Sequence, residues 1–392
     1  MSVAAREDAG TGGEHRPGLS FAGVFVATFC GLVAIGSVLP VLPRYIHGPL
    51  GSGNVAVGVV IGSYAITGLL LRPVAGRLAD TRGRKPMVVA GAVLVAIAGL
   101  LYLPNLGIAG LIAARLVLGA GEGTVYTAGS AWIVDLAPPE RRGRVLGLYG
   151  LAVWGGLSVG PLVGQLILDH GGYHAVWIFA AAMPALGALV AATARDPFVP
   201  RAHAEPHPLI APEAVSPGFA IALASFGYAA VATFIVLHLE ARGVGHGATV
   251  FGAFAAMIVL TRLVIGDLPD RVGATPVAVA ATLGEAAGLV LIAVAQSLPV
   301  ALLGGMAMGA AFSLLNPSLM LIALGRVSES ARGAAMGTYT AFFDAGVGLG
   351  APLAGLVAAL SNYEGAFFFA AAVSGCSALL ILASRRRAVT AR

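Results

Sequence analysis

Charged residues are scarce in this sequence. They make up 10% of its 392 residues, whereas a soluble globular protein is about one quarter charged. Apolar residues reach 58%, and the mean hydropathy is +0.90. A helix needs roughly 20 apolar residues to cross about 30 Å of hydrocarbon with its backbone hydrogen bonds satisfied internally. The composition therefore excludes a soluble fold and predicts a protein that crosses a membrane many times.

Cysteine is almost absent as well. Cys30 and Cys376 are the only two, and both fall within long apolar runs. Two cysteines placed in this way exclude a disulfide framework and a cysteine-based metal cluster, and we expect neither a metal nor a cofactor. The first 18 residues lack the basic segment and short apolar core of a cleavable signal, so the first long run is expected to remain as a span.

Uncharged or nearly uncharged runs of membrane-spanning length recur along the chain. Short polar or proline-containing segments, such as Pro104-Asn105, separate them as tight turns would. We predict an all-α polytopic membrane protein with twelve spans. They cover residues 19–43, 54–74, 87–103, 106–136, 145–169, 175–194, 217–239, 248–265, 277–295, 300–325, 334–360 and 365–384.

The basic residues predict the orientation. With the N-terminus inside, the cytoplasmic segments hold 18 of the 23 Lys and Arg residues, and the outer loops hold only Arg44 and Arg242. Cytoplasmic loops are normally enriched in this way, so both termini are expected in the cytoplasm. The net charge of +5 then reflects topology in a lipid bilayer, and no nucleic acid is expected as a partner. Alanine richness and a single lysine suggest a bacterial inner (cell) membrane protein.

An internal repeat divides the chain. At a constant offset of 190 residues Arg72 matches Arg262, Gly83 matches Gly273, and Pro86 matches Pro276. We therefore predict two six-helix bundles of the same orientation, joined by a proline-rich linker. The predicted parts are a cytoplasmic tail (1–18), the first bundle (19–194), the cytoplasmic linker (195–216), the second bundle (217–384) and a basic cytoplasmic tail (385–392).

The stretch "GRLADTRGRKP" at 76–86 concentrates charge between two apolar runs. Together with the parallel six-helix repeat, it resembles the loop between spans two and three of major facilitator superfamily transporters, and the resemblance extends over nearly the whole chain. It implies a conformational gate in which Asp80 caps a helix end and Arg84 pairs with Asp135. The gate residues would be Gly76, Asp80, Gly83, Arg84 and Asp135. The alternative is a solvated loop whose charges only set topology.

A second motif lies in the fifth predicted span, where "GGLSVGPLVG" contains Gly156, Gly160, Pro161 and Gly164. It is similar to a motif that the same superfamily associates with antiporters. The segment "LPVLP" at 39–43 resembles a proline motif of twelve-span drug exporters. Together these resemblances imply the drug:proton antiporter group, whereas the residues alone are also consistent with close packing of small residues between helices.

Two charged residues of the fourth predicted span are candidates for proton coupling. Arg115 and Glu122 lie seven residues apart, so they share nearly the same helix face. A charge at the bilayer centre is costly and usually faces a cavity or a partner. Arg115 followed by Gly119 resembles a motif linked in the superfamily to proton transfer, although Leu118 stands where glutamine is common. We expect Glu122 to carry a proton beside Arg115; the alternative is a fixed structural ion pair.

Other polar residues occur at middle depths of the predicted spans. Asp344 lies in the eleventh span, which the resemblance places beside the central cavity, so it is a candidate for proton or substrate binding. Arg72 and Arg262 lie about one turn inside the boundary, where we expect them to extend to water. The predicted substrate-binding residues are Tyr64, Glu122, Tyr126, Asn316 and Asp344.

The main hypothesis is a monomeric secondary transporter, driven by a proton gradient, that exports small amphipathic molecules by alternating access. An importer or a sugar exporter of the same fold is the alternative within transport. A non-transporting receptor or scaffold is a different class, but no predicted outer loop exceeds about ten residues. We do not expect an enzyme, because no nucleophile–base pair, metal-ligand cluster or phosphate-binding loop stands out.

Overall fold

The computed structural model describes residues 17–138, 141–194, 211–325, 327 and 332–390, and the regular structure in these ranges is helical. The helices are α1 (Pro17–Val38), α2 (Val41–His47), α3 (Asn54–Arg82), α4 (Arg84–Leu101), α5 (Gly107–Leu136), α6 (Arg142–Thr193), α7 (Pro212–Ala241), α8 (Gly247–Ile265), α9 (Leu268–Val272), α10 (Ala274–Val294), α11 (Leu298–Leu324), α12 (Arg332–Leu360) and α13 (Tyr363–Thr390).

Eleven helical segments of the described chain are long and apolar enough to cross a membrane. One of them runs from Val145 to Thr193, 49 residues, and breaks at Gly172. The backbone there has φ 68° and ψ −172°, which is not helical, so α6 consists of two helices joined at this glycine. This division agrees with the twelve crossings predicted from the sequence.

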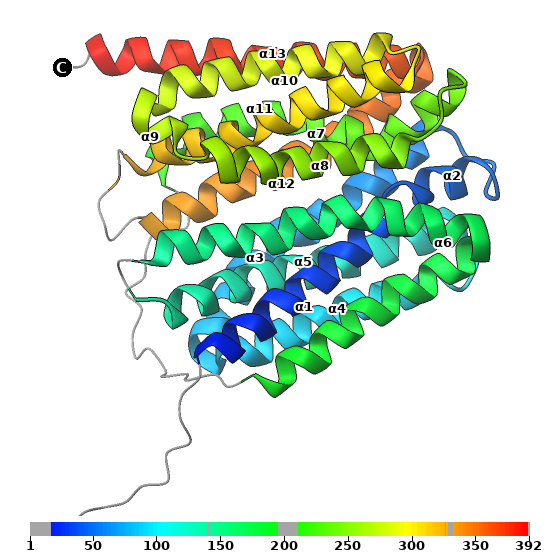
Figure 1. Cartoon of the computed structure of the whole chain (residues 1–392), viewed down its shortest axis with the longest axis horizontal. Helices are drawn as coiled ribbons and strands as arrows, with labels where there is room; N and C mark the ends of the chain where they lie inside the picture. The colour runs from blue at the N-terminus through cyan, green and yellow to red at the C-terminus, as the bar shows by residue number, and fades with distance from the viewer. Residues whose placement is uncertain (1–16, 139–140, 195–210, 326, 328–331, 391–392) are drawn as a thin grey trace, which may run out of the picture.

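The helices form two bundles. Helices α1–α6 pack mainly against one another, and so do α7–α13; α3 contacts α12 and α6 contacts α8 across the boundary. Figure 1 shows α1, α4 and α5 in the lower part of the view and α10, α11 and α13 in the upper part. Most of the predicted linker, residues 195–210, lies outside the described residues, as do 1–16 of the first tail. The predicted C-terminal tail begins as helix, since α13 continues to Thr390.

The prediction of a loop at 76–86 is wrong. Helix α3 continues through this stretch to Arg82, and α4 begins at Arg84, so Gly83 alone joins them. Gly83 has φ 105°, and its repeat partner Gly273, directly before α10, has φ 103°. Only glycine adopts such angles without strain, which explains why the two halves share this glycine.

The first predicted span is also interrupted. Helix α1 ends at Val38, and α2 begins at Val41 after a turn that contains Pro40. Proline has no backbone N–H to donate within a helix and clashes with the preceding turn. The segment "LPVLP" therefore marks a break in this crossing.

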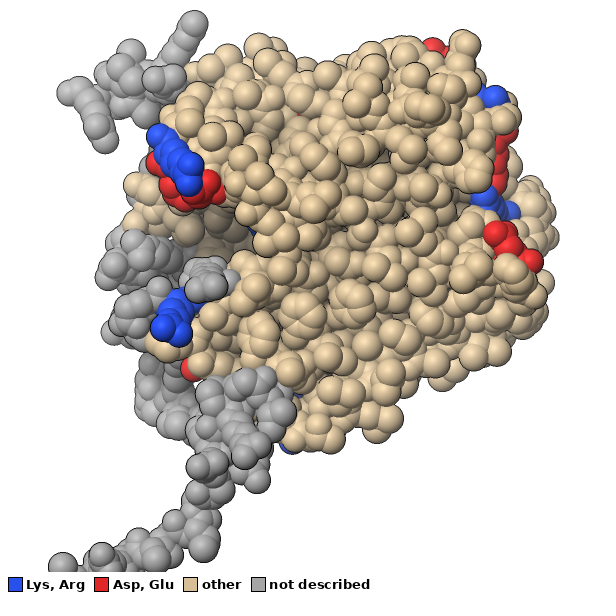
Figure 2. Space-filling model, viewed as in Figure 1, with Lys and Arg blue, Asp and Glu red and all other residues tan. Residues whose placement is uncertain are grey.

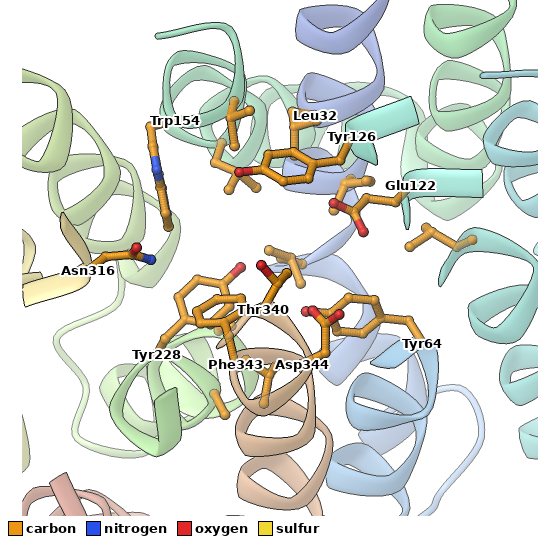
Figure 3. Close-up of a pocket in the computed structure, with 18 of the residues that line it drawn as sticks. Leu32, Tyr64, Glu122, Tyr126, Trp154, Tyr228, Asn316, Thr340, Phe343 and Asp344 are labelled. Carbon is orange, nitrogen blue, oxygen red and sulfur yellow. The ribbon is translucent and has the colours of Figure 1, made fainter. Parts of the chain in front are cut away.

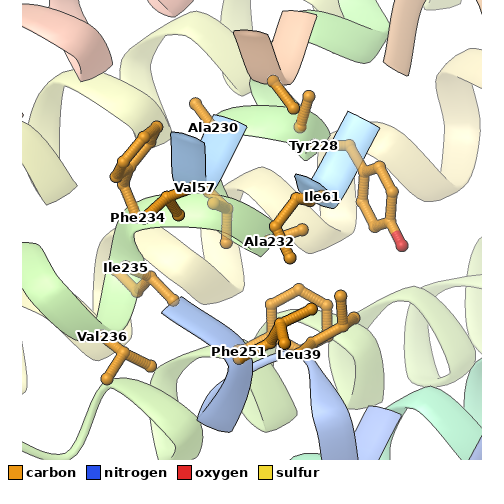
Figure 4. Packing of buried hydrophobic residues seen from close by; sticks show 14 of the residues in the cluster. Leu39, Val57, Ile61, Tyr228, Ala230, Ala232, Phe234, Ile235, Val236 and Phe251 are labelled. Atoms are coloured by element: carbon orange, nitrogen blue, oxygen red, sulfur yellow. The ribbon is translucent and has the colours of Figure 1, made fainter. Parts of the chain in front are cut away.

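The two bundles touch closely at one end of the molecule, which we call the closed end. It carries the loops between α2 and α3, between α7 and α8, and between α12 and α13. A Cβ atom placed on Gly58 of α3 would lie 2.3 Å from the carbonyl oxygen of Ala351 in α12, so the two backbones are in direct contact. Figure 4 shows Val57 beside Ala230 and Phe234 of α7 in the same apolar cluster, which crosses the boundary between the bundles.

Polar contacts add to this seal. Arg44 of α2 forms an ion pair with Glu240 of α7. The Asn54 Nδ2 donates a hydrogen bond to the Ala358 carbonyl oxygen at 3.2 Å, and the Tyr363 hydroxyl donates to Asn54 Oδ1 at 3.1 Å. All three contacts join the first bundle to the second.

The opposite end, which we call the open end, carries the start of α1 and the junction of α3 and α4. Figure 2 shows the surface hollowed at this end, between basic side chains drawn in blue. Here Gly147 of α6 and Gly337 of α12 have no described atom within 4 Å of an added Cβ. The bundles are thus sealed at one end, and the surface between them is hollowed at the other.

Candidate functional site

A cavity of about 200 Å³ lies between the two bundles. Its wall combines aromatic and charged side chains from both bundles, as Figure 3 shows for part of it. The aromatic lining residues are Tyr64, Tyr126, Trp154, Tyr228, Tyr339 and Phe343. The charged lining residues are Arg72, Arg115, Glu122, Arg262 and Asp344, and Asn316 and Thr340 are among the neutral polar ones.

Three charged residues of the cavity form one group, which we call the ion triad: Arg72, Glu122 and Asp344. The Arg72 Nε lies 2.7 Å from Asp344 Oδ2, and its Nη2 lies 3.2 Å from Asp344 Oδ1. The same Nη2 lies 3.4 Å from Glu122 Oε2. Because Arg72 belongs to α3 and Asp344 to α12, the bidentate pair bridges the two bundles at the cavity.

The ion triad corrects two sequence predictions. Arg72 was expected to extend to water, but 15% of its side chain is exposed and it pairs with two carboxylates. Glu122 was expected to pair with Arg115, but it pairs with Arg72 instead. The Arg72 side chain passes beside Gly123 of α5, where an added Cβ would lie 3.5 Å from Arg72 Cγ, an ordinary contact distance.

Arg115 has no carboxylate partner among the described residues, although its side chain is buried. Its Nη2 donates a hydrogen bond to the Ile61 carbonyl oxygen at 2.9 Å. Its guanidinium carbon lies 4.9 Å from the centre of the Tyr64 ring, a cation–π arrangement. The Nε and Nη1 atoms have no hydrogen-bond partner in the part of the chain that the structure describes. Buried polar groups are normally paired, so these two donors mark an unusual position in the wall.

Arg262 contributes a further cation from the second bundle. Its Nη2 donates to the Ser313 carbonyl oxygen at 3.3 Å, and no described carboxylate pairs with it. The expectation that Arg262 extends to water is incomplete, since the side chain is half-buried and lines the cavity. Its repeat partner Arg72 also lines this cavity, so the two matched arginines lie on the wall of the same cavity.

The structure places all five predicted substrate-binding residues, Tyr64, Glu122, Tyr126, Asn316 and Asp344, on the cavity wall. Tyr126 lies one helical turn from Glu122, as expected. The centre of its ring lies 5.3 Å from the guanidinium carbon of Arg72. The carbonyl oxygen of Asn316 accepts a hydrogen bond from the Tyr339 hydroxyl at 3.1 Å.

Sequence reasoning predicted Tyr64 and Tyr126 but missed the other aromatic residues of the wall, Trp154, Tyr228, Tyr339 and Phe343. Trp154 lies 6.2 Å from Tyr228 and 5.8 Å from Phe312 between ring centres, so an aromatic cluster joins α6, α7 and α11. Phe343 lies next to Asp344 in sequence and also lines the cavity. An apolar aromatic in a membrane span gives no sequence signal of its own. The one usable sign was Trp154, which directly precedes the "GGLSVGPLVG" motif.

The predicted contact between Arg84 and Asp135 is present. The Arg84 Nε lies 3.1 Å from Asp135 Oδ2, and its Nη1 lies 2.6 Å from Asp80 Oδ1. This group ties α4 to the ends of α3 and α5 within the first bundle at the open end. Gly76 lies on α3, where an added Cβ would be 3.7 Å from Thr127 of α5.

The glycines of the fifth predicted span pack α6 against α1. A Cβ on Gly160 would lie 2.7 Å from the Cα of Gly36, and one on Gly164 would lie 2.1 Å from the Ser37 carbonyl oxygen. Gly156 makes a similar approach, and Pro161 contacts Gly36. Since α1 supplies Leu32 and Ile35 to the cavity, and the turn after it supplies Leu39, this close packing positions one wall of the cavity.

Within the described residues, no group of three or more His, Cys, Asp or Glu side chains could hold a metal ion. The charged cavity groups instead pair with each other or face the cavity.

Comparison with known proteins agrees with this architecture. The family model described as Major Facilitator Superfamily matches residues 24–259 and 218–392. An uncharacterized MFS-type transporter of Pseudomonas aeruginosa (strain UCBPP-PA14) is 34% identical over 94% of both chains. The uncharacterized MFS-type transporter YhhS of Escherichia coli K12 is 32% identical over 95% of this chain and 94% of its own.

Among solved structures, the human organic anion transporter MFSD10 superposes with a TM-score of 0.72, over 94% of this chain and 100% of its own. At 18% identity this likeness shows the fold alone. The family-model match and the relatives above 30% identity each cover most of the chain. The chain therefore belongs to the major facilitator superfamily of membrane transporters.

Proposed function

We propose that this protein is a proton-coupled secondary transporter that exports small amphipathic compounds by alternating access of its two bundles. The observation that carries the proposal is the bridge from Arg72 in α3 to Asp344 in α12, made at the cavity and across the boundary between bundles. An ion pair between the bundles at the cavity stabilises one position of the bundles relative to each other.

Protonation would act directly on this bridge. A buried ion pair that loses one charge leaves the other uncompensated, and breaking such a pair is strongly destabilising. A proton on Asp344 would therefore weaken the state that the bridge stabilises. Glu122 holds the same guanidinium at 3.4 Å, so the two carboxylates share one cation and both are proposed proton-binding groups.

The closed end and the positive-inside distribution together suggest where the cavity opens. If the basic segments lie in the cytoplasm, the closed end faces outward and the substrate enters from inside. Tyr64, Tyr126 and Asn316 would then contact the substrate. A gate at the open end would act when that end closes and the present closed end opens. It would consist of Arg84, Asp80 and Asp135, with Gly76 and Gly83.

The direction of transport has two candidates. Export is favoured by the resemblance of the segment with Gly156, Gly160, Pro161 and Gly164 to a motif of antiporters. The close packing of these residues against α1 fits that motif and ordinary packing of small residues alike. For an anionic substrate, import together with a proton is favoured by the charge of the cavity. Three arginines and two carboxylates line it, a formal charge of +1, and a proton would raise that charge to +2.

Proteoliposomes with an imposed pH gradient test the proposal. We expect the gradient to drive accumulation of at least one probe from a small amphipathic set, such as ethidium or 4-phenylbutyrate. Glu122→Gln and Asp344→Asn should abolish the dependence on the gradient. Asp267→Asn, at an exposed pair with Arg271, is the control. Transport that ignores the gradient in the wild-type protein would contradict proton coupling.

A further inference from the structure

We propose that the substrate is an organic anion: one carboxylate or similar acidic group on an aromatic or otherwise apolar body. The acidic group would be held by Arg115 and drawn in by Arg262. This inference rests on the proposed transport function and specifies the ligand class of the same cavity.

The charges of the wall separate into two sets. In the ion triad, one arginine is shared by two carboxylates, so these acids already have a cationic partner. Arg115 and Arg262 lie outside the triad, and neither pairs with a described carboxylate. A cationic ligand would have to compete with Arg72 for the acids, whereas an anionic ligand finds two cations without an acidic partner.

Arg115 provides the strongest observation. Its side chain is 1% exposed, it lines the cavity, and its Nε and Nη1 lack hydrogen-bond partners. The Tyr102 hydroxyl lies beside this guanidinium and can accept a hydrogen bond from one of the two nitrogens. At least one N–H group then remains for a ligand. A planar guanidinium with free donors suits a carboxylate, because such bonds are charge-assisted and have a defined geometry.

Arg262 reaches the cavity from the opposite bundle. Its single hydrogen bond, to the Ser313 carbonyl oxygen, leaves the remaining guanidinium nitrogens free of described partners. It belongs to the last turn of α8, on the side of the open end, and its charge faces the route by which a ligand would approach Arg115. An anion entering from that end would meet this cation before it reaches the buried one.

The neutral part of the wall specifies the body of the ligand. Trp154, Tyr228 and Phe343 line the cavity, and aromatic side chains of this kind bind apolar and aromatic groups by stacking and burial. Figure 3 shows Tyr228 and Phe343 close together on one side of the cavity. An apolar body against this group and an acidic group at Arg115 would use both features of the site.

Three probes that share one body separate the ligand charges: 4-phenylbutyrate, 4-phenylbutyramide and 4-phenylbutylamine. Calorimetric titration of the full chain in lipid nanodiscs at pH 7 measures each dissociation constant. We expect the acid to bind about tenfold or more tightly than the amide, as one charge-assisted hydrogen bond implies, and the amine to bind no more tightly than the amide. Equal binding of all three, tightest binding of the amine, or binding of none would overturn the proposal.

Variants assign the preference to residues. Arg115→Gln should reduce the preference for the acid to within about twofold of the amide, and Arg262→Gln should weaken acid binding by a smaller factor. Retained amide binding shows that a variant has folded, and Arg262→Gln remains informative if Arg115→Gln does not fold. The matched control is Arg271→Gln, an arginine outside the cavity whose side chain is 73% exposed. A preference that survives both cavity variants would overturn the assignment. These binding outcomes are independent of the pH-gradient assay, so either proposal can fail alone.

Discussion

Asp344→Asn is expected to loosen the closed end of the protein, because it removes the charge that joins the two bundles. In the structure Arg72 makes two hydrogen bonds to this carboxylate, at 2.7 and 3.2 Å. Asparagine has nearly the same shape but carries no charge and can accept only through one oxygen. The substitution thus removes the ion pair while largely keeping the packing.

The size of the effect follows from burial and from the partner that remains. Removing one member of a fully buried pair costs about 3–5 kcal/mol. Arg72 is partly exposed and keeps Glu122 at 3.4 Å, so the smaller range for hydrogen bonds to charged groups, about 1.5–3 kcal/mol, applies. A loss of about 2 kcal/mol changes a population ratio about 30-fold, so a ratio of 100:1 would fall to about 3:1.

Double electron–electron resonance can measure these populations. Spin labels at Asn105 and Ser361 lie at the closed end on opposite bundles, and both positions are exposed. The labels require a background in which Cys30 and Cys376 are replaced. We expect a second, longer distance to gain population in Asp344→Asn but not in the control Asp267→Asn, since exposed pairs contribute at most about 1 kcal/mol. An unchanged distance distribution in Asp344→Asn would refute the role assigned to the bridge.

Three further predictions concern other parts of the molecule. Gly164→Ala should lower the melting temperature of the purified protein, because its Cβ would lie 2.1 Å from the Ser37 carbonyl oxygen and overpacking costs about 1–3 kcal/mol. The control Gly147→Ala, on the same helix, should leave the melting temperature unchanged. Equal melting temperatures of the two variants would contradict the packing described. Glu240→Gln should open the closed end slightly in the same resonance experiment, by less than Asp344→Asn because its side chain is 38% exposed. Binding of 4-phenylbutyrate should tighten from pH 8 to pH 6, because a proton on Glu122 or Asp344 raises the formal charge of the cavity wall from +1 to +2; constant or weaker binding over that range would contradict this electrostatic reasoning.

Much of the fold could be predicted from sequence because the bilayer constrains it strongly. Long apolar runs must be helical in hydrocarbon, and their number and repeat then indicate two bundles. The boundaries were less predictable. The charged stretch at 76–86 looks like a loop in composition, yet a helix can extend beyond the membrane into water, and only Gly83 departs from helical angles there.

The candidate site was only partly predictable, because depth can be estimated from sequence but pairing between helices cannot. Glu122 and Asp344 stood out as charges within spans, and both line the cavity. Their common partner Arg72 lies close enough to a span end to suggest contact with water, and its role depends on the approach of α5, which carries Glu122, and of α12 from the other bundle. Such contacts arise from the tertiary fold and leave no local pattern.

The most direct test of the central claim is a pH titration of the closed-end distance in the wild-type protein and in the double variant Glu122→Gln, Asp344→Asn. Protons that bind the ion triad should release the bridge, so the population of the closed distance should fall as the pH is lowered in the wild-type protein. The double variant should show a distribution that does not change with pH. A wild-type distribution that is constant with pH, or an equal pH response in the double variant, would contradict the account that these carboxylates couple protons to the movement of the bundles.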